Sequence, residues 1–249
     1  MKIELLRNCS HGSEIATYLV SNWKPVKIMK VSSTTNGILD LKSEITGWNW
    51  YQEIRYPSME TPICKVVMEK HNYLKIDIDY IEGRQGDYRK GLIYNEDVIK
   101  KVIVHYSDIW PVSQNGMTPL HGDFSLENII INDNGINIFD WEHFAFDAAP
   151  WGFDPIYLLF ETLWFNFEGK KRLNKKEIQI VSRCIQSLES RHLSKDIADH
   201  PLSFLISFIY DNKHLWRTQV NKLPVLRFTQ EQVCFIDETI THLRHSWAI

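Results

Sequence analysis

The stretch from His121 to Glu142, which reads HGDFSLENIIINDNGINIFDWE, restricts the fold more than any other part of the chain. Two short apolar runs, residues 128–131 and 136–139, flank the turn sequence Asp133-Asn134-Gly135. An Asn-Gly pair between β-branched runs is the strongest short-range signal for a β-hairpin. We therefore predict a tight hairpin here.

The predicted hairpin has a consequence for three polar side chains. Antiparallel partners lie only about 5 Å apart. Asp123 and Asn128 on the entering side are therefore expected to meet Asp140 on the leaving side.

This grouping suits phosphoryl transfer. That reaction needs a carboxylate that accepts a proton from the attacking hydroxyl, and oxygen ligands for Mg²⁺. The spacing His-x-Asp-x-x-x-x-Asn, followed by a hairpin and a second Asp, is that arrangement. Alternatively, Asp123 and Asn128 only cap turns, where both residue types are common.

The stretch resembles the aminoglycoside phosphotransferase and choline kinase family, the small-molecule branch of the protein-kinase-like fold. The residues that carry the resemblance are His121, Gly122, Asp123, Phe124, Asn128, Ile138, Phe139, Asp140, Trp141 and Glu142. The resemblance implies that Asp123 is the catalytic base, that Asn128 and Asp140 are metal ligands, and that ATP and Mg²⁺ are used.

The rest of the chain fits this family in order. We expect an α+β, two-lobed protein-kinase-like fold, with a small antiparallel β lobe that holds one helix and a larger, mainly helical lobe that carries the catalytic β-hairpin. The first lobe, residues 1–82, would bind nucleotide, and the second, residues 83–249, would carry catalysis and acceptor binding. Patterning predicts strands at 2–6, 14–20, 26–31, 63–68 and 74–81, and helices at 38–51, 94–110, 154–166, 174–190, 202–219 and 229–247.

A lysine and a glutamate of the first lobe are candidates for binding phosphate. Strand alternation places Lys30 on the same face as Val26 and Ile28. The resemblance implies that Lys30 contacts the nucleotide phosphates and is held by Glu44 of the following helix. Two alternatives stay open: Lys27 is the phosphate lysine, or Lys30 and Glu44 are solvated surface charges.

Two loops of the first lobe are further candidates for nucleotide contacts. Ser10 and Gly12 lie in a polar loop whose backbone N–H groups could face phosphate oxygens, although an ordinary hairpin turn explains the loop equally well. Asp79 and Ile81 lie where the family's linker pairs with the adenine edge by its backbone, and a plain loop is the alternative.

Asp154 has two interpretations. It precedes Pro155 and therefore suits the N-terminal cap of a helix. The resemblance implies instead that it braces the catalytic loop from below.

Composition excludes some functions. A net charge of −3 and a pI near 6.4 favour no nucleic-acid partner. Four separated cysteines without a C-x-x-C pair suggest neither a disulfide framework nor a zinc site. Without a signal peptide or an apolar run of about 18 residues, membrane insertion is not expected, and a soluble, cytoplasmic protein is.

We therefore expect a kinase that acts on a hydroxyl of a small polar acceptor: an aminoglycoside-like or other sugar compound, or choline. A kinase of a cell-envelope glycan sugar and a nucleotide-binding pseudokinase scaffold are the alternatives. Acidic and indole side chains suit a cationic acceptor. Aromatic platforms suit plain sugar rings equally, and core packing is the default for any one tryptophan. The candidates for the acceptor wall are Glu142, Trp151, Glu161, Trp164, Asp211 and Trp216.

Overall fold

A computed structural model of the chain describes residues 1–8, 14–167 and 174–246. The chain forms two compact units. The first consists of residues 1–83 with residues 139–145, and the second of residues 84–138 with residues 146–249. The segment 139–145 thus groups with the first unit although it follows the hairpin in sequence.

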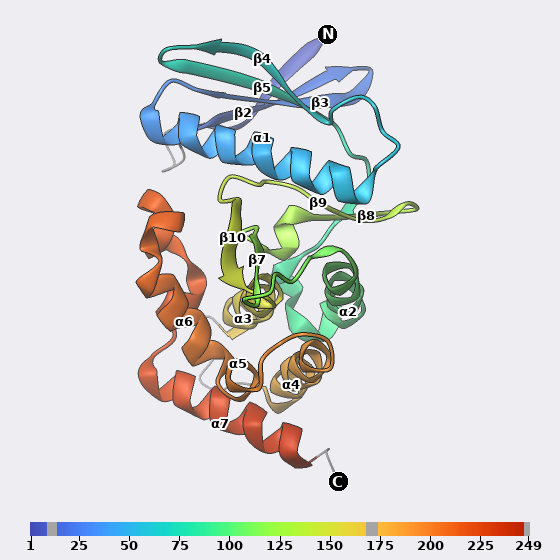
Figure 1. Cartoon of the computed structure of the whole chain (residues 1–249). Coiled ribbons are helices and arrows are strands. Elements are labelled where there is room, and N and C mark those ends of the chain that lie inside the picture. Colours follow the sequence, from blue (N-terminus) through green and yellow to red (C-terminus); the bar gives the residue numbers. More distant parts are fainter. Residues whose placement is uncertain (9–13, 168–173, 247–249) are drawn as a thin grey trace. The chain divides into compact units, whose positions relative to one another are not determined.

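The first unit contains a five-stranded antiparallel sheet in the order β1-β2-β3-β5-β4 (Figure 1). Its strands lie close to the predicted ranges. They are β1 (Lys2–Arg7), β2 (Ala16–Asn22), β3 (Lys24–Ser32), β4 (Cys64–Lys70) and β5 (Tyr73–Asp79).

Helix α1 (Thr35–Arg55) packs against this sheet. It begins after Thr34, whose hydroxyl accepts a hydrogen bond from the N–H of Gly37 at 3.2 Å, as an N-cap residue does. Its buried side repeats every three or four residues through Leu41, Glu44 and Trp48. A glutamate therefore shares the inner face of the helix with core residues.

Trp141 attaches segment 139–145 to α1. Its ring lies 5.1 Å from that of Tyr51 and 5.7 Å from that of Trp50. A Cβ atom added at Gly47 would lie 2.6 Å from the Cβ of Trp141, so only glycine permits this approach. Aromatic packing and a glycine contact thus fix the residue that stands between Asp140 and Glu142.

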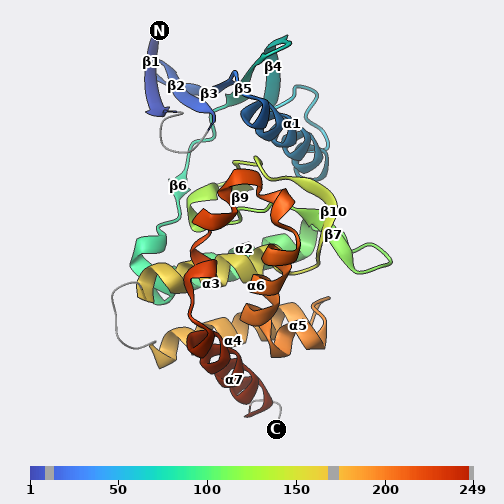
Figure 2. The ribbon, with the colours of Figure 1, turned by 90° about the vertical axis from the view of Figure 1, so that its left-hand side faces the viewer.

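The second unit is mainly helical (Figure 2). In it α2 packs against α3 and α4, and α7 packs against α4 and α6. Its helices are α2 (Gly91–Ile109), α3 (Phe153–Phe167), α4 (Lys175–Glu189), α5 (Lys195–Asp199), α6 (Pro201–Asp211) and α7 (Gln230–Ser246). Its remaining strands are β6 (Arg84–Gln85), β7 (Met117–Leu120), β8 (Ile129–Asn132), β9 (Gly135–Ile138) and β10 (Ala145–Pro150).

The predicted hairpin is present as β8 and β9, whose register pairs Ile129 with Ile138 and Asn132 with Gly135. The positive φ of the connection falls on Gly135, at 104°. β6 adds a third strand beside β8.

The prediction of one helix over residues 202–219 is wrong. α6 ends at Asp211, and 3-10 turns follow at Lys213–Leu215 and Arg217–Lys222. Asn212 ends the helix with non-helical backbone angles, and its side-chain N–H₂ donates to the carbonyl of Phe208 at 2.9 Å. Short polar side chains that bond to nearby backbone compete with helix continuation.

Within the described ranges, no helix combines the length and the apolar composition needed to cross a membrane.

Glycine-to-alanine exchange inside a helix usually stabilises a protein, by about 1 kcal/mol. We expect the opposite for Gly47→Ala, because the added methyl would collide with Trp141. The free energy of unfolding, measured by urea denaturation, should fall by about 1–3 kcal/mol. Thr46→Ala, an exposed change on the same helix, is the control, and equal stability of the two variants would contradict the close contact.

Candidate active site

The predicted site residues lie in both units, so the geometry is described within each unit. Lys30, Glu44 and Asp140 belong to the first unit, whereas Asp123 and Asn128 belong to the second. The expected meeting of Asp123 and Asn128 with Asp140 therefore stays a prediction.

In the first unit Lys30 is surrounded by three carboxylates, and we call these four residues the lysine cluster. The Lys30 ammonium lies 2.6 Å from Glu44 Oε2 and 3.5 Å from Glu142 Oε1, and it also forms an ion pair with Asp140. Lys30 and Glu44 are buried, which excludes the interpretation that they are solvated surface charges. Lys27, the alternative phosphate lysine, pairs with Asp77.

The cluster keeps Lys30 charged. Burial alone would lower the pKa of Lys30, but Asp140, Glu44 and Glu142 raise it well above its ordinary value. Burial and the neighbouring Asp140 carboxylate raise the pKa of Glu142 to about 8, against the opposing effect of Lys30. Burial likewise raises the pKa of Glu44.

The cluster has the composition of a site for a hard divalent cation. Carboxylate oxygens of Glu44, Asp140 and Glu142 lie within 4.8 Å of one another. Among the described residues, Glu44 Oε1 is buried without a hydrogen-bond donor. Oxygen ligands of this kind are those that Mg²⁺ and Ca²⁺ prefer.

Glu142 was predicted only as a wall residue for the acceptor, but the structure places it in the lysine cluster, 3.9 Å from the guanidinium of Arg7. The sequence signal that could have found it is its position two residues after Asp140. Asp140 has a φ of 66°, in the left-handed region, so the alternation of an extended strand does not explain this proximity.

In the second unit the loop 121–128 carries Asp123 and Asn128. Asn128 Nδ2 donates to the backbone oxygen of Asp123 at 2.8 Å and to its Oδ2 at 3.1 Å. The backbone N–H of Ser125 donates to the same backbone oxygen at 2.9 Å. Most loop residues are buried, whereas Asp123 is half-buried. Glu127 is the exposed residue of the loop. The loop thus holds Asp123 between buried neighbours, and the Asn128 amide orients its carboxylate.

Asp154 supports this loop from α3. Its two carboxylate oxygens accept hydrogen bonds from the backbone N–H groups of His121 and Gly122, at 2.9 and 3.1 Å. Burial raises the pKa of Asp154 to about 7, although the two N–H donors act in the opposite direction. Of its two interpretations, the structure therefore supports the brace over the helix cap.

Several predicted wall residues are core residues. Trp151 and Trp216 are buried, and their indole N–H groups donate to the carbonyls of Trp110 and Gly122 at 3.3 and 2.6 Å. Glu161 is buried and accepts a hydrogen bond from Tyr157 at 3.2 Å. Trp164 is half-buried, and Asp211 is exposed. Hydrophobic periodicity could not separate these roles, because it does not indicate which face a side chain packs against.

The remaining candidates concern nucleotide contacts. Ser10 and Gly12 lie outside the described residues. Asp79 ends β5, and its backbone N–H donates to the carbonyl of Ile63 at 2.9 Å. Ile81 is half-buried after the strand. The adenine contact of Asp79 and Ile81 stays a prediction.

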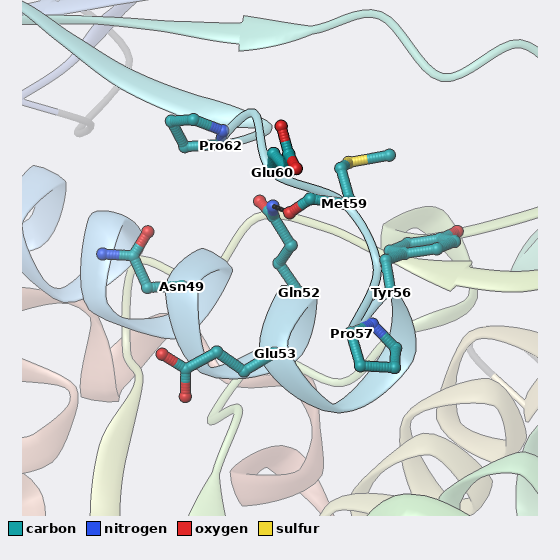
Figure 3. Close-up of a pocket in the computed structure, with 8 residues that line it drawn as sticks. All are labelled: Asn49, Gln52, Glu53, Tyr56, Pro57, Met59, Glu60 and Pro62. Carbon is teal, nitrogen blue, oxygen red and sulfur yellow. Dashed lines mark hydrogen bonds between the residues drawn. The ribbon is translucent and has the colours of Figure 1, made fainter.

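A separate pocket of about 300 Å³ lies near the C-terminal end of α1 (Figure 3). Gln52 in its lining donates to the carbonyls of Met59 and Thr61 and accepts from the N–H of Ile63 at 2.7 Å. This glutamine therefore closes the loop that follows α1. The lining residues are Asn49, Gln52, Glu53, Tyr56, Pro57, Met59, Glu60 and Pro62, and none of the predicted site residues is among them.

The sheet with its single helix, together with the helical unit that carries the hairpin, defines the predicted α+β protein-kinase-like fold. No protein-family model matches the sequence, and no curated protein sequence matches it.

Among solved structures, the chain is similar to amicoumacin kinase hAmiN, in complex with AMP-PNP, Ca²⁺ and Ami. The two are 9% identical, with a TM-score of 0.51 over 98% of this chain and 88% of that chain. This likeness confirms the fold that the family resemblance implied.

Weaker likenesses are found to ADP-bound aminoglycoside phosphotransferase APH(2'')-Ib and to an ethanolamine kinase of Plasmodium vivax. The first is 13% identical, with a TM-score of 0.45 over 98% of this chain and 94% of that chain. The second is 11% identical, with a TM-score of 0.48 over 98% of this chain and 81% of that chain.

The buried Glu161 generates a pH prediction. Burial first, and then the neighbouring Asp123, raise the pKa of Glu161 well above its ordinary value of 4.5. The folded protein therefore holds this proton more tightly than the unfolded chain, and the contribution of Glu161 to stability falls as the pH rises above about 4.5.

Glu161→Gln removes this titration while its amide oxygen can still accept from Tyr157. Between pH 5 and pH 8 the variant should gain stability relative to the wild type, by up to about 1.4 kcal/mol per pH unit. Urea denaturation at several pH values measures this difference. The exposed Glu238→Gln on α7 is the control, and a pH-independent difference for Glu161→Gln would contradict the assignment.

Proposed function

We propose that this chain is an ATP-dependent kinase that transfers the γ-phosphate to a hydroxyl of a small polar acceptor, with Mg²⁺ as its divalent cation. The observation that carries the proposal is the lysine cluster. A buried ammonium on β3, held 2.6 Å from a glutamate of α1 and paired with Asp140, is the arrangement expected for binding nucleotide phosphates.

Lys30 would bind phosphate oxygens. Glu44 and Asp140 keep it charged and restrict its position, so little side-chain freedom is lost when an anion binds. In this structure its three N–H donors face Glu44, Asp140 and Glu142, so a phosphate oxygen would take the place of one of these carboxylates. Charge-assisted hydrogen bonds to phosphate are stronger than neutral ones.

Asp123 would accept the proton of the acceptor hydroxyl. Asn128 orients its carboxylate through Oδ2, and Asp154 holds the backbone on which it sits. Asp123 is half-buried between the buried residues Gly122 and Phe124, so its carboxylate can still meet a substrate. A general base acts when it lies within hydrogen-bond reach of the proton that it removes.

Asn128 and Asp140 would hold the divalent cation. Asn128 uses its amide nitrogen within the loop, which leaves its amide oxygen for a metal. Asp140 belongs to the group of three carboxylates in the first unit. When bound, Mg²⁺ offsets the negative charge of the phosphates.

The charge of the side chains near Asp123 supports one class of acceptor. Asp123 and Glu127 both raise the pKa of the buried Glu161, so these two carboxylates lie near Glu161, which itself keeps its proton and adds no charge. An acidic surrounding favours an acceptor that carries an amino or ammonium group. Amino sugars, choline and ethanolamine are compounds of this kind.

The direct test is transfer of label from γ-labelled ATP with Mg²⁺ to a panel of aminoglycosides, choline, ethanolamine and neutral sugars. Transfer to an amine-bearing member supports the whole proposal. Transfer to a neutral sugar alone would overturn the acceptor class, and no transfer or hydrolysis with any member would contradict the kinase assignment.

Asp123→Asn should lower kcat by about 10²–10⁴-fold, because an amide cannot accept the proton. Nucleotide affinity, measured by isothermal titration, should change little. Asp133→Asn makes the same chemical change at an exposed position of the hairpin turn and should leave kcat unchanged. Undiminished turnover of Asp123→Asn would end the assignment of the base.

Lys30→Met should raise the KM for ATP by about tenfold or more, because charge-assisted hydrogen bonds to phosphate are lost. Lys27→Met, on the same strand, should leave it unchanged. Circular dichroism should confirm that both variants fold, since Lys30 pairs with the buried Glu44 and Glu142 and with the half-buried Asp140. An equal change of the KM for ATP in the two variants would contradict the proposal that Lys30 binds the phosphates.

A further inference from the structure

Trp216 lies between the two 3-10 turns that follow α6, far in sequence from the loop 121–128. Its side chain has no exposed surface. Its indole N–H donates to the carbonyl oxygen of Gly122 at 2.6 Å. This hydrogen bond gives the backbone carbonyl of the buried Gly122 a donor.

The bonded carbonyl belongs to the peptide group that joins Gly122 to Asp123. A peptide group is planar, so a partner on its oxygen also restricts the orientation of the N–H at the other end. That N–H, from Asp123, donates to His121 Nδ1 at 3.3 Å. The peptide plane leading into Asp123 is thus held at both of its polar ends.

Asp154 fixes the preceding peptide group. It accepts from the N–H of Gly122, which has a φ of 86° that favours glycine. The ring of Phe153, the residue before Asp154, lies 5.8 Å from the ring of Trp216. The carboxylate and the indole that hold the loop therefore come from neighbouring, packed elements.

The backbone at Trp216 is constrained as well. Arg217, the next residue, has a φ of 47°, in the left-handed region that residues other than glycine rarely adopt. Such a conformation persists where the surrounding structure determines it, and it occurs most often at functional sites. Here it fixes the path of the chain directly after the indole.

We propose that Trp216 is a positioning residue for Asp123. Its indole N–H holds the Gly122–Asp123 peptide group and thereby aims the Asp123 carboxylate. The inference rests on the proposed function of Asp123 as the base, and it assigns to the segment after α6 a role in the chemistry of the loop.

The test compares Trp216→Phe with Trp151→Phe. Each change keeps an aromatic ring and removes one buried indole donor to a backbone carbonyl of the second unit. Hydrogen–deuterium exchange of peptides covering residues 119–128 measures the loop directly. We expect exchange in this loop to be faster by about fivefold or more in Trp216→Phe only.

Kinetics with ATP and an acceptor from the panel measure the consequence. We expect kcat of Trp216→Phe to fall by up to about 10²-fold, with the KM for ATP within about twofold of the wild type, because misplacement of a catalytic group affects the chemical step. Trp151→Phe should retain the wild-type kcat.

The outcomes separate the inference from the proposed function. Faster loop exchange only in Trp216→Phe supports the positioning role even if the wild type transfers no phosphate, in which case the kinase proposal alone fails. Unchanged loop exchange in Trp216→Phe, or an equal loss of kcat in both variants, overturns the inference, since Trp216 would then be an ordinary core residue.

Discussion

The buried charge of Lys30 imposes the strongest requirement on this structure. Removing an ammonium from water costs several kcal/mol unless carboxylates surround it closely. Three carboxylates surround the Lys30 ammonium: Glu44 from α1, and Asp140 and Glu142 from segment 139–145. The cluster therefore couples three separate parts of the first unit, and a chain without Lys30 would leave its carboxylates without that cation.

In the second unit, hydrogen bonds from several elements hold the backbone that carries the Asp123 carboxylate. Asp154 and Trp216 bond to the two polar groups of Gly122, and Asn128 holds Asp123 directly. All of these partners are buried, so the bonds are protected from competition with water. The position of Asp123 thus depends on α3 and on the turns after α6, and not on the loop alone.

Local signals predicted a large part of this fold. The hairpin followed from turn chemistry and β-branched runs, and its strands form as expected, with the positive φ on Gly135. Lys30 and Glu44 were proposed as partners from the family resemblance, and they lie 2.6 Å apart. Local reasoning failed for the helix over 202–219, where apolar periodicity continues past Asn212 but the backbone does not. Trp151 and Trp216 were candidates for the acceptor wall, with core packing as the default for any tryptophan, and the structure places both in the core.

The sequence by itself determined the hairpin, the five strands and one helix of the first unit, and the residue types available for chemistry, because these depend on neighbours a few positions apart. Only the tertiary structure decided which carboxylates share Lys30, that Glu142 is one of them, and that Trp216 supports the loop of Asp123. Those contacts join residues up to 112 positions apart. These contacts form because of how the buried faces pack together and because packing buries polar groups that then need hydrogen-bond partners. A local sequence pattern indicates neither the packing nor the partners.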